Sequence, residues 1–445
     1  MSNEKLVRGL GRWDFTAIVV NTIIGAGIFG LPAKVYAQIG SWSLLAFAAC
    51  TLVIGLVVLA HAEVSSRFSA TGGPYLYARE AYGSLVGFEV GWLFWTVRIT
   101  TFAANCNLFI TYLGFFIPGA NEGGLRIALI VGVVLTLTVV NIRGIRHSAL
   151  MTNFLTAGKL IPLVIFAGIG MFFIEPANFN FDPLPGYSSF STSVLLLIYA
   201  FVGFEAAVVL SGEVKDPERS IPFGTLVALA LCSILYIMVQ AVSIGTLPGL
   251  AASERPIADA SVIFLGIFGA GFITVGALFS IFGNLNSGVL ASTRTLFAMS
   301  EQRQLPAILS RTHVRYKTPT VSILLTAAVM FVLTIQSSFL SAVTIATITR
   351  LIIYATTCLS LPVFRRRKNL PAPAFKAPFG VTVAMLSIAL IVWLLSNVDY
   401  TKEGRPLIIA AVAGLVVFAA FRWFSGGPIT DDGRSDAEGL PINPS

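Results

Sequence analysis

The sequence predicts an all-α polytopic membrane protein with twelve transmembrane helices. The first observation is the composition, since 56% of the 445 residues are hydrophobic and only 11% are charged, whereas a soluble domain has about 25% charged residues. The second is a series of long stretches free of Asp, Glu, Lys and Arg, among them 35–60, 220–253 and 318–349. Each exceeds the roughly 20 residues that a helix needs to cross a bilayer. The third is that glycines interrupt two of the apolar spans at membrane depth.

The apolar stretches and the loops between them define the spans in order. The third and the eighth are too long for one perpendicular crossing, so we expect these two helices to be tilted or to continue past the membrane. The predicted spans are 15–38, 43–64, 85–116, 126–142, 149–173, 191–211, 223–246, 261–297, 320–336, 340–362, 378–396 and 406–423.

The first span contains Gly25, Gly27 and Gly30, followed by Pro32. Each glycine costs about 1 kcal/mol in a helix relative to alanine. A bilayer tolerates irregular backbone only where it is buried in protein or lines a wet cavity. The pattern therefore predicts a broken helix beside a cavity whose walls are backbone N–H and C=O groups, which is how broken-helix transporters hold an amino acid. A glycine-rich packing face is the alternative, but it leaves Pro32 and a second interruption unexplained.

The second interruption lies five spans later, where Gly203 and the ionisable Glu205 stand in an otherwise apolar span. Interruptions in the first and sixth spans predict two inverted repeats of five helices each. We expect a single transmembrane domain over 1–445. Its repeats would lie at about 13–174 and 188–364, followed by two extra helices at about 376–424 and a disordered tail at about 425–445.

The basic residues indicate the orientation. The loops that alternate on one side of the predicted topology carry 21 lysine and arginine residues, and those on the other side carry only Arg126, Arg255, Lys402 and Arg405. By the positive-inside rule both termini should be cytoplasmic. We expect the membrane to be the plasma (inner) membrane. The net charge of +8 follows this topology, so it does not indicate a nucleic-acid partner. The four basic residues left at membrane depth are Lys34, Arg98, Lys159 and Arg350.

Other functional classes find little support in the sequence. The four cysteines lie in apolar spans without metal-ligand spacing, and His61, His147 and His313 are not clustered, so we expect no metal, no cofactor and no enzymatic activity. A channel would need a continuous polar stripe or ring, and the polar residues are isolated. A sensor with a transporter-like fold and a channel for small solutes stay as alternatives to a transporter.

Five segments in order carry a resemblance to a known family. They are 25–32 in the first span, 71–75 after the second, 201–205 in the sixth, 213–222 behind it, and 305–306 after the eighth. With these segments the chain resembles, over nearly its whole length, the amino acid–polyamine–organocation (APC) superfamily of amino acid permeases, which have the leucine-transporter-like fold. The resemblance implies secondary active transport of amino acids by alternating access, coupled to protons or by exchange. The implied partners are an amino acid, protons and the lipid bilayer.

The resemblance also implies where the substrate binds. The α-carboxylate would lie on the backbone of Gly25, Ala26 and Gly27, because a helix N-terminus offers unpaired N–H groups and a partial positive charge. Many members have serine where Ala26 stands, so carboxylate binding should be weaker here. The α-ammonium would lie on the carbonyls of Ile23, Tyr199 and Val202. Tyr199 would be an aromatic gate over the substrate, or else an ordinary core tyrosine.

Two ionisable residues are candidates for coupling and gating. Lys159 lies near the middle of the fifth span. In sodium-independent members that this chain resembles, a lysine there replaces a sodium ion and reaches the first-span break and the eighth span. Glu205 lies near the membrane midplane, where ionisable groups are costly and usually functional. The resemblance implies that Glu205 holds the broken helices together and senses protonation, and a purely structural role is the alternative.

Arg98 departs from the family pattern, because neutral residues are usual near this position of the third span. A guanidinium stays charged and needs a carboxylate partner. Glu205 is the better protein candidate, since Glu89 lies on the opposite face of the same helix. If the two are paired, small or apolar amino acids are the expected substrates, and if Arg98 is unpaired, an acidic side chain could be its partner. Arg350 raises the same question without a named partner.

Several polar residues have less definite predicted positions. Asn284, Asn286 and Ser287 of the eighth span could face Lys159 or the substrate, or could hydrogen-bond between helices. His61 and Glu63 end the second span, and we expect them at the membrane interface.

Overall fold

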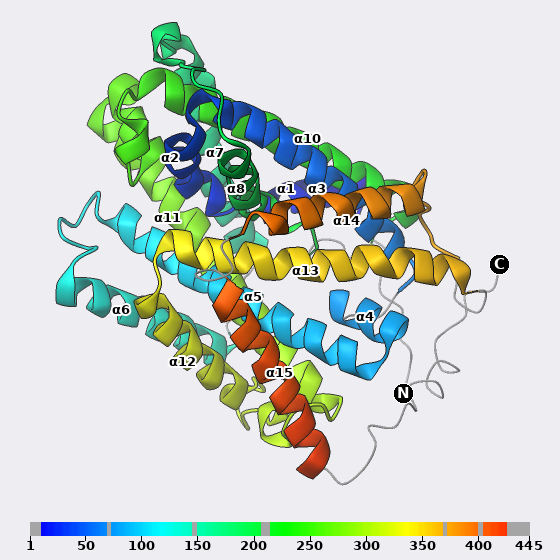
Figure 1. The fold of residues 1–445 in the computed structure, drawn as a ribbon. Helices are drawn as coiled ribbons and strands as arrows, with labels where there is room; N and C mark the ends of the chain where they lie inside the picture. Colours follow the sequence, from blue (N-terminus) through cyan, green and yellow to red (C-terminus); the bar gives the residue numbers. More distant parts are fainter. Residues whose placement is uncertain are drawn as a thin grey trace.

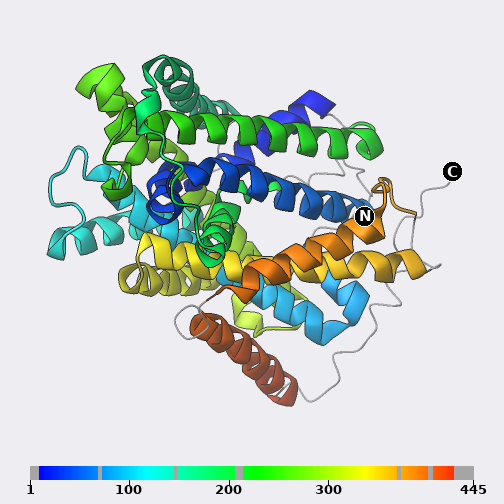
Figure 2. The same ribbon diagram turned by 45° about the horizontal axis from the view of Figure 1, so that its top comes forward.

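The computed structural model describes residues 10–68, 73–144, 149–205, 214–367, 372–398 and 404–424. Within these ranges the regular structure is helical, apart from an isolated parallel bridge between Leu10 and Val214. Figures 1 and 2 show the helices gathered into one bundle in which most of the long helices run in a common direction. The predicted tail at 425–445 and parts of the segments at 71–75 and 213–222 lie outside the described residues.

The first half of the chain forms a broken helix and five further helices. The break separates α1 from α2, and a short helix, α4, precedes the long α5. The bounds are α1 Arg12–Ile23, α2 Gly27–Ile39, α3 Ser43–Ser65, α4 Pro74–Tyr82, α5 Ser84–Leu113, α6 Gly123–Arg143 and α7 Ala149–Gly170.

The second half begins with α8, Tyr187–Ile198, which continues as one 3₁₀ turn, Tyr199–Phe201, before the backbone becomes extended at Val202. The helices that follow are α10 Pro217–Thr246, α11 Pro256–Glu301, α12 Thr320–Gln336, α13 Phe339–Arg366, α14 Gly380–Ser396 and α15 Arg405–Phe424. A helix lies in every predicted span. Figure 2 shows α15 at the edge of the bundle, where the indole N–H of Trp92 on α5 donates to the carbonyl of Ala410.

Within the described residues, five helical stretches are long and apolar enough to cross a membrane: Gly27–Ser65, Gly123–Arg143, Arg219–Thr246, Pro256–Glu301 and Phe339–Arg366. Five shorter apolar helices accompany them. The longest stretch is bent, because Gly266 has a left-handed backbone with φ of 65°. The prediction of the eighth span, 261–297, therefore missed the bend at Gly266 near its start.

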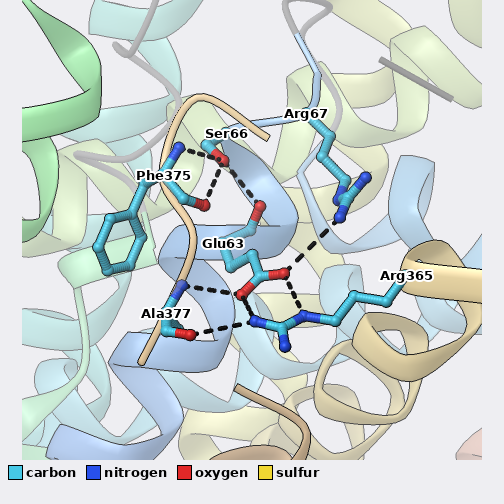
Figure 3. Close-up of polar contacts among 6 residues, drawn as sticks. All are labelled: Glu63, Ser66, Arg67, Arg365, Phe375 and Ala377. Atoms are coloured by element: carbon cyan, nitrogen blue, oxygen red, sulfur yellow. Dashed lines mark hydrogen bonds and ion pairs between the residues drawn. The ribbon is translucent and has the colours of Figure 1, made fainter. Parts of the chain in front are cut away.

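A cluster of polar contacts joins the ends of α3 and α13 to the segment before α14 (Figure 3). The Glu63 carboxylate accepts two hydrogen bonds from Arg365, at 2.7 and 2.6 Å, and one from the Ala377 backbone N–H at 2.9 Å. Ser66 binds the backbone of Phe375 in the same segment. His61 and Glu63 are 3% and 0% exposed, so both are buried among the helices, and their position at the membrane interface stays a prediction.

We predict that Glu63→Ala lowers the free energy of unfolding by about 3 kcal/mol. Removing the buried carboxylate takes a partner from two cations, Arg67 and Arg365, whose side chains are 7% and 23% exposed. Arg365 would keep its bond to the Ala377 carbonyl. Denaturant unfolding in detergent micelles measures the loss. The matched control is Glu80→Ala, which removes an exposed pair with Arg367 at 3.7 Å and should cost less than about 1 kcal/mol. Equal losses in the two variants would contradict the prediction.

Candidate functional site

A cavity of about 550 Å³ lies in the middle of the bundle, between the α1–α2 break and the extended segment after α8. We call it the central cavity. Its walls come from both interrupted segments and from α5, α6, α7, α11 and α13. Every predicted site residue except Glu205 lines it: Ile23, Gly25, Ala26, Gly27, Arg98, Lys159, Tyr199 and Val202.

The first interruption is short. Helix α1 ends at Ile23, the backbone of Ile24 is extended with φ of −70° and ψ of 102°, and α2 begins at Gly27. The first turn of α2 therefore presents backbone N–H groups that no preceding helical turn can bind, and the last turn of α1 presents carbonyls in the same way. Both helix ends open onto the central cavity.

The two interrupted segments pack backbone against backbone. Gly203 has a positive φ of 118°, and a Cβ atom on it would collide with the carbonyl of Thr22. A Cβ atom on Gly27 would lie 2.7 Å from the Cα of Ala200. No larger residue fits either position without separating the segments, so these two glycines permit the close approach.

Tyr236 of α10 ties the two interruptions together, and sequence reasoning missed it. Its hydroxyl lies 3.2 Å from the carbonyl of Ile23 and 3.1 Å from that of Ala200, so that one donor reaches both segments. The side chain is fully buried. A tyrosine deep in an apolar span must find a partner for its hydroxyl, and that is the signal the sequence offered.

Lys159 of α7 binds the end of α1, a contact that the family resemblance implied. Its ammonium donates to the carbonyls of Asn21 at 2.5 Å and Ile24 at 2.9 Å. These carbonyls form the negative end of the α1 dipole, so a positive charge is favourable there. Among the described residues, the hydrogen bonds of the ammonium go to these two carbonyls, and none goes to α11, which the resemblance also implied it would reach.

Glu205 pairs with Arg350, not with Arg98. Arg350 Nη1 donates to Glu205 Oε1 at 2.6 Å, and both side chains are 4% exposed. The other carboxylate oxygen accepts from the Gly203 N–H at 2.9 Å and from the Tyr354 hydroxyl at 3.2 Å. The predicted Arg98–Glu205 pair was therefore wrong. Glu205 holds the second interruption to α13, whereas Tyr236 joins the two interruptions.

Tyr199 is fixed to α5. Its hydroxyl lies 2.6 Å from the Asn105 side-chain oxygen and 3.3 Å from the carbonyl of Thr101. The hydroxyl of Thr101 in turn accepts from Arg350 at 3.3 Å. Asn105 and Thr101 also line the central cavity, and the sequence did not single them out because short polar residues are common on helix faces that bind other helices.

Arg98 lies one turn from Thr101 on α5 and lines the central cavity. Its guanidinium lies over the ring of Phe94, 4.8 Å from the ring centre. Among the residues that the structure describes, no carboxylate lies within ion-pair distance of it, and its buried Nε has no hydrogen-bond partner. Asn284, Asn286 and Ser287 of α11 also line the central cavity, and Asn286 accepts a hydrogen bond from Asn141.

The chain matches the amino acid permease family model over residues 10–420. It is 27% identical to the methylthioribose transporter of Bacillus subtilis (strain 168) over 94% of each chain. It is 28% identical to the serine/threonine exchanger of the same organism, over 93% of this chain and 96% of the relative. It is 27% identical to the arginine/agmatine antiporter of Chlamydia pneumoniae, over 88% and 86%.

Proposed function

The chain belongs to the amino acid permease family, and we propose that it is a sodium-independent secondary active amino acid transporter that works by alternating access. The sequence resemblance to amino acid permeases is thereby confirmed, and the chain is an integral membrane protein whose relatives are transporters and not enzymes. The proposed mechanism couples transport to protons or exchanges one substrate for another.

The observation that carries the proposal is that both interrupted segments line one central cavity. The N–H groups at the start of α2 suit a carboxylate, and the carbonyls of Ile23, Tyr199 and Val202 suit an ammonium. Ile23 already accepts from Tyr236, but a carbonyl oxygen has two lone pairs and can accept a second hydrogen bond. An amino acid bound between the two helix ends would give hydrogen-bond partners to both the N–H groups and the carbonyls.

The proposed topology follows the order of the helices. The first repeat would contain α1 to α7 and begin with the α1–α2 break, and the second would contain α8 to α13 and begin with the interruption after α8. Helices α14 and α15 would be the two extra helices. The loop charges support a cytoplasmic position of both termini.

Reconstitution into liposomes tests the proposed function. Uptake of a panel of labelled amino acids should occur in vesicles of purified protein, and should increase with an inward proton gradient or with internal substrate. A panel without any uptake or counterflow under either condition would overturn the proposal. Adding methylthioribose to the panel tests whether the substrate is an amino acid at all, because one relative carries that name.

We predict that transport needs no sodium. The ammonium of Lys159 binds the α1 carbonyls of Asn21 and Ile24, and so supplies the positive charge that a sodium ion would provide. Replacing sodium with choline at fixed pH should leave the initial uptake rate unchanged. Uptake that disappears in choline would refute this, and Lys159→Met should lose uptake in both media.

We also predict that cationic substrates bind poorly. Two like charges ~4 Å apart repel by roughly 4 kcal/mol at an effective dielectric constant of about 20, and the Arg98 guanidinium faces the central cavity without an ion-pair partner among the described residues. Arginine, lysine and agmatine should therefore compete weakly for uptake. Tight binding of any of them would show that Arg98 does not act on the substrate, and the relative named for arginine and agmatine makes this a necessary test.

A further inference from the structure

Arg98 belongs to the face of α5 that borders the central cavity. Arg98, Thr101, Phe102 and Asn105 all line it, and their spacing of three, four and seven residues places them on one side of a helix. Thr101 and Asn105 are engaged by Arg350 and Tyr199. Arg98 has no such partner and contacts the ring of Phe94. An aromatic ring has no net charge, so this contact does not neutralise Arg98. The carboxylate of Glu205 acts on Arg98 only beyond ion-pair distance and is paired directly with Arg350, so two guanidinium groups share one carboxylate.

The charges around the cavity are unequal. Arg98, Lys159 and Arg350 contribute basic groups to its wall, and no Asp or Glu side chain among the described residues lines it. The nearby carboxylate of Glu205 is taken by Arg350, Tyr354 and the Gly203 N–H. Lys159 is held by two helix-end carbonyls. The group left free to attract an anion is therefore the Arg98 guanidinium.

We propose that the transported amino acid has an acidic side chain, as in glutamate or aspartate, and that Arg98 binds this second carboxylate. The proposal rests on the proposed function, because it needs an amino acid whose α-carboxylate and α-ammonium occupy the two helix ends. The charges of those two groups cancel. The substrate's side chain alone therefore decides whether an opposite charge lies beside Arg98. A guanidinium binds a carboxylate through two parallel hydrogen bonds, which makes arginine a selective partner for this group.

Pairs of substrates that differ only in the side-chain charge give the sharpest test. Glutamate and glutamine have nearly the same shape, as do aspartate and asparagine. In proteoliposomes of the full chain, each is used to compete with the uptake of a labelled amino acid from the panel. The acidic member of a pair should bind at least about tenfold more tightly than its amide, the factor expected for a hydrogen-bonded charge pair.

Three variants assign the preference to Arg98. Arg98→Met should bring glutamate and glutamine to equal affinity. Arg98→Lys keeps the charge and loses the paired geometry, so its preference should be intermediate. Arg311→Met is the matched control, because Arg311 is exposed and lies outside the cavity, and it should keep the full preference. A thermal unfolding scan of each purified variant shows that the fold is retained.

The outcomes separate the two proposals. Uptake of neutral amino acids without any preference for glutamate over glutamine would overturn the acidic-substrate inference and leave the transport function standing. A preference that survives in Arg98→Met would overturn the role of Arg98. If no amino acid in the panel is taken up or competes, the proposed function itself fails.

Discussion

Replacing Gly25 with valine should abolish amino acid binding while the protein stays folded. Gly25 lines the central cavity between α1 and α2, where the backbone is proposed to hold the α-carboxylate. A Cβ atom there would lie 2.5 Å from the Asn284 side-chain nitrogen, the end of a flexible side chain that can move. The two γ-carbons of valine would then occupy the space in front of the backbone N–H groups. Binding should fall by more than about 100-fold, since a carboxylate would lose several charge-assisted hydrogen bonds.

Ligand-induced thermal stabilisation in detergent measures this effect, because binding only to the folded state raises the unfolding temperature. Gly132→Val is the matched control, since a Cβ atom on Gly132 meets no atom within 4 Å and the residue is exposed on α6. Normal affinity in Gly25→Val would overturn the site assignment. Gly27→Val is a poorer test, because the new side chain would push against the backbone of Ala200 and disturb the fold.

Separating Glu205 from Arg350 should have the largest effect on stability. The pair is buried, and removing one partner of a buried pair costs about 3 to 5 kcal/mol because the other charge is left without compensation. Glu205→Gln and Arg350→Met should each lose this much free energy of unfolding. The double variant should lose much less than the sum of the two, because it contains neither charge.

Denaturant unfolding of the wild type, the two single variants and the double variant gives the coupling energy between Glu205 and Arg350 directly. Additive losses would show that the pair is not a unit, and would contradict the geometry at 2.6 Å. Uptake gives a second measurement, because Glu205 also caps the Gly203 N–H at the interruption. We expect Glu205→Gln and Arg350→Met each to lose transport. This expectation does not depend on the stability of the double variant.

The broken helices could be predicted from the sequence because their signal is local. Glycine and proline at membrane depth are unfavourable for any continuous helix, and the bilayer leaves few alternatives. In the first span a few adjacent residues determine the outcome. The contact of Lys159 with the end of α1 was instead implied by the family resemblance.

The pairing of Glu205 could not be predicted, because it depends on how α13 is rotated about its axis. The sequence predicts that both Arg98 and Arg350 lie near the membrane midplane. Only the packed structure shows that Arg350 points at the Glu205 carboxylate. Tyr236 and the contacts of Glu63 depend in the same way on the positions of distant helices. Gly266 was missed because a single glycine in a long apolar helix has many uses.

The contacts of Lys159 have a consequence for the electrical behaviour of transport. A lysine is covalently part of α7 and remains there throughout a cycle, whereas a bound sodium ion can be released on the other side. If transport is sodium-independent, as proposed, the charge moved per cycle is that of the transported molecules alone. Moving one elementary charge against a potential of 100 mV costs about 2.3 kcal/mol. An anionic substrate would therefore be expelled by an inside-negative voltage unless a proton or an outgoing anion travels with it. Either coupling makes the cycle electroneutral, so a voltage clamp across the reconstituted membrane should register no substrate-dependent current, and acidification of the vesicle interior would mark the proton as the companion.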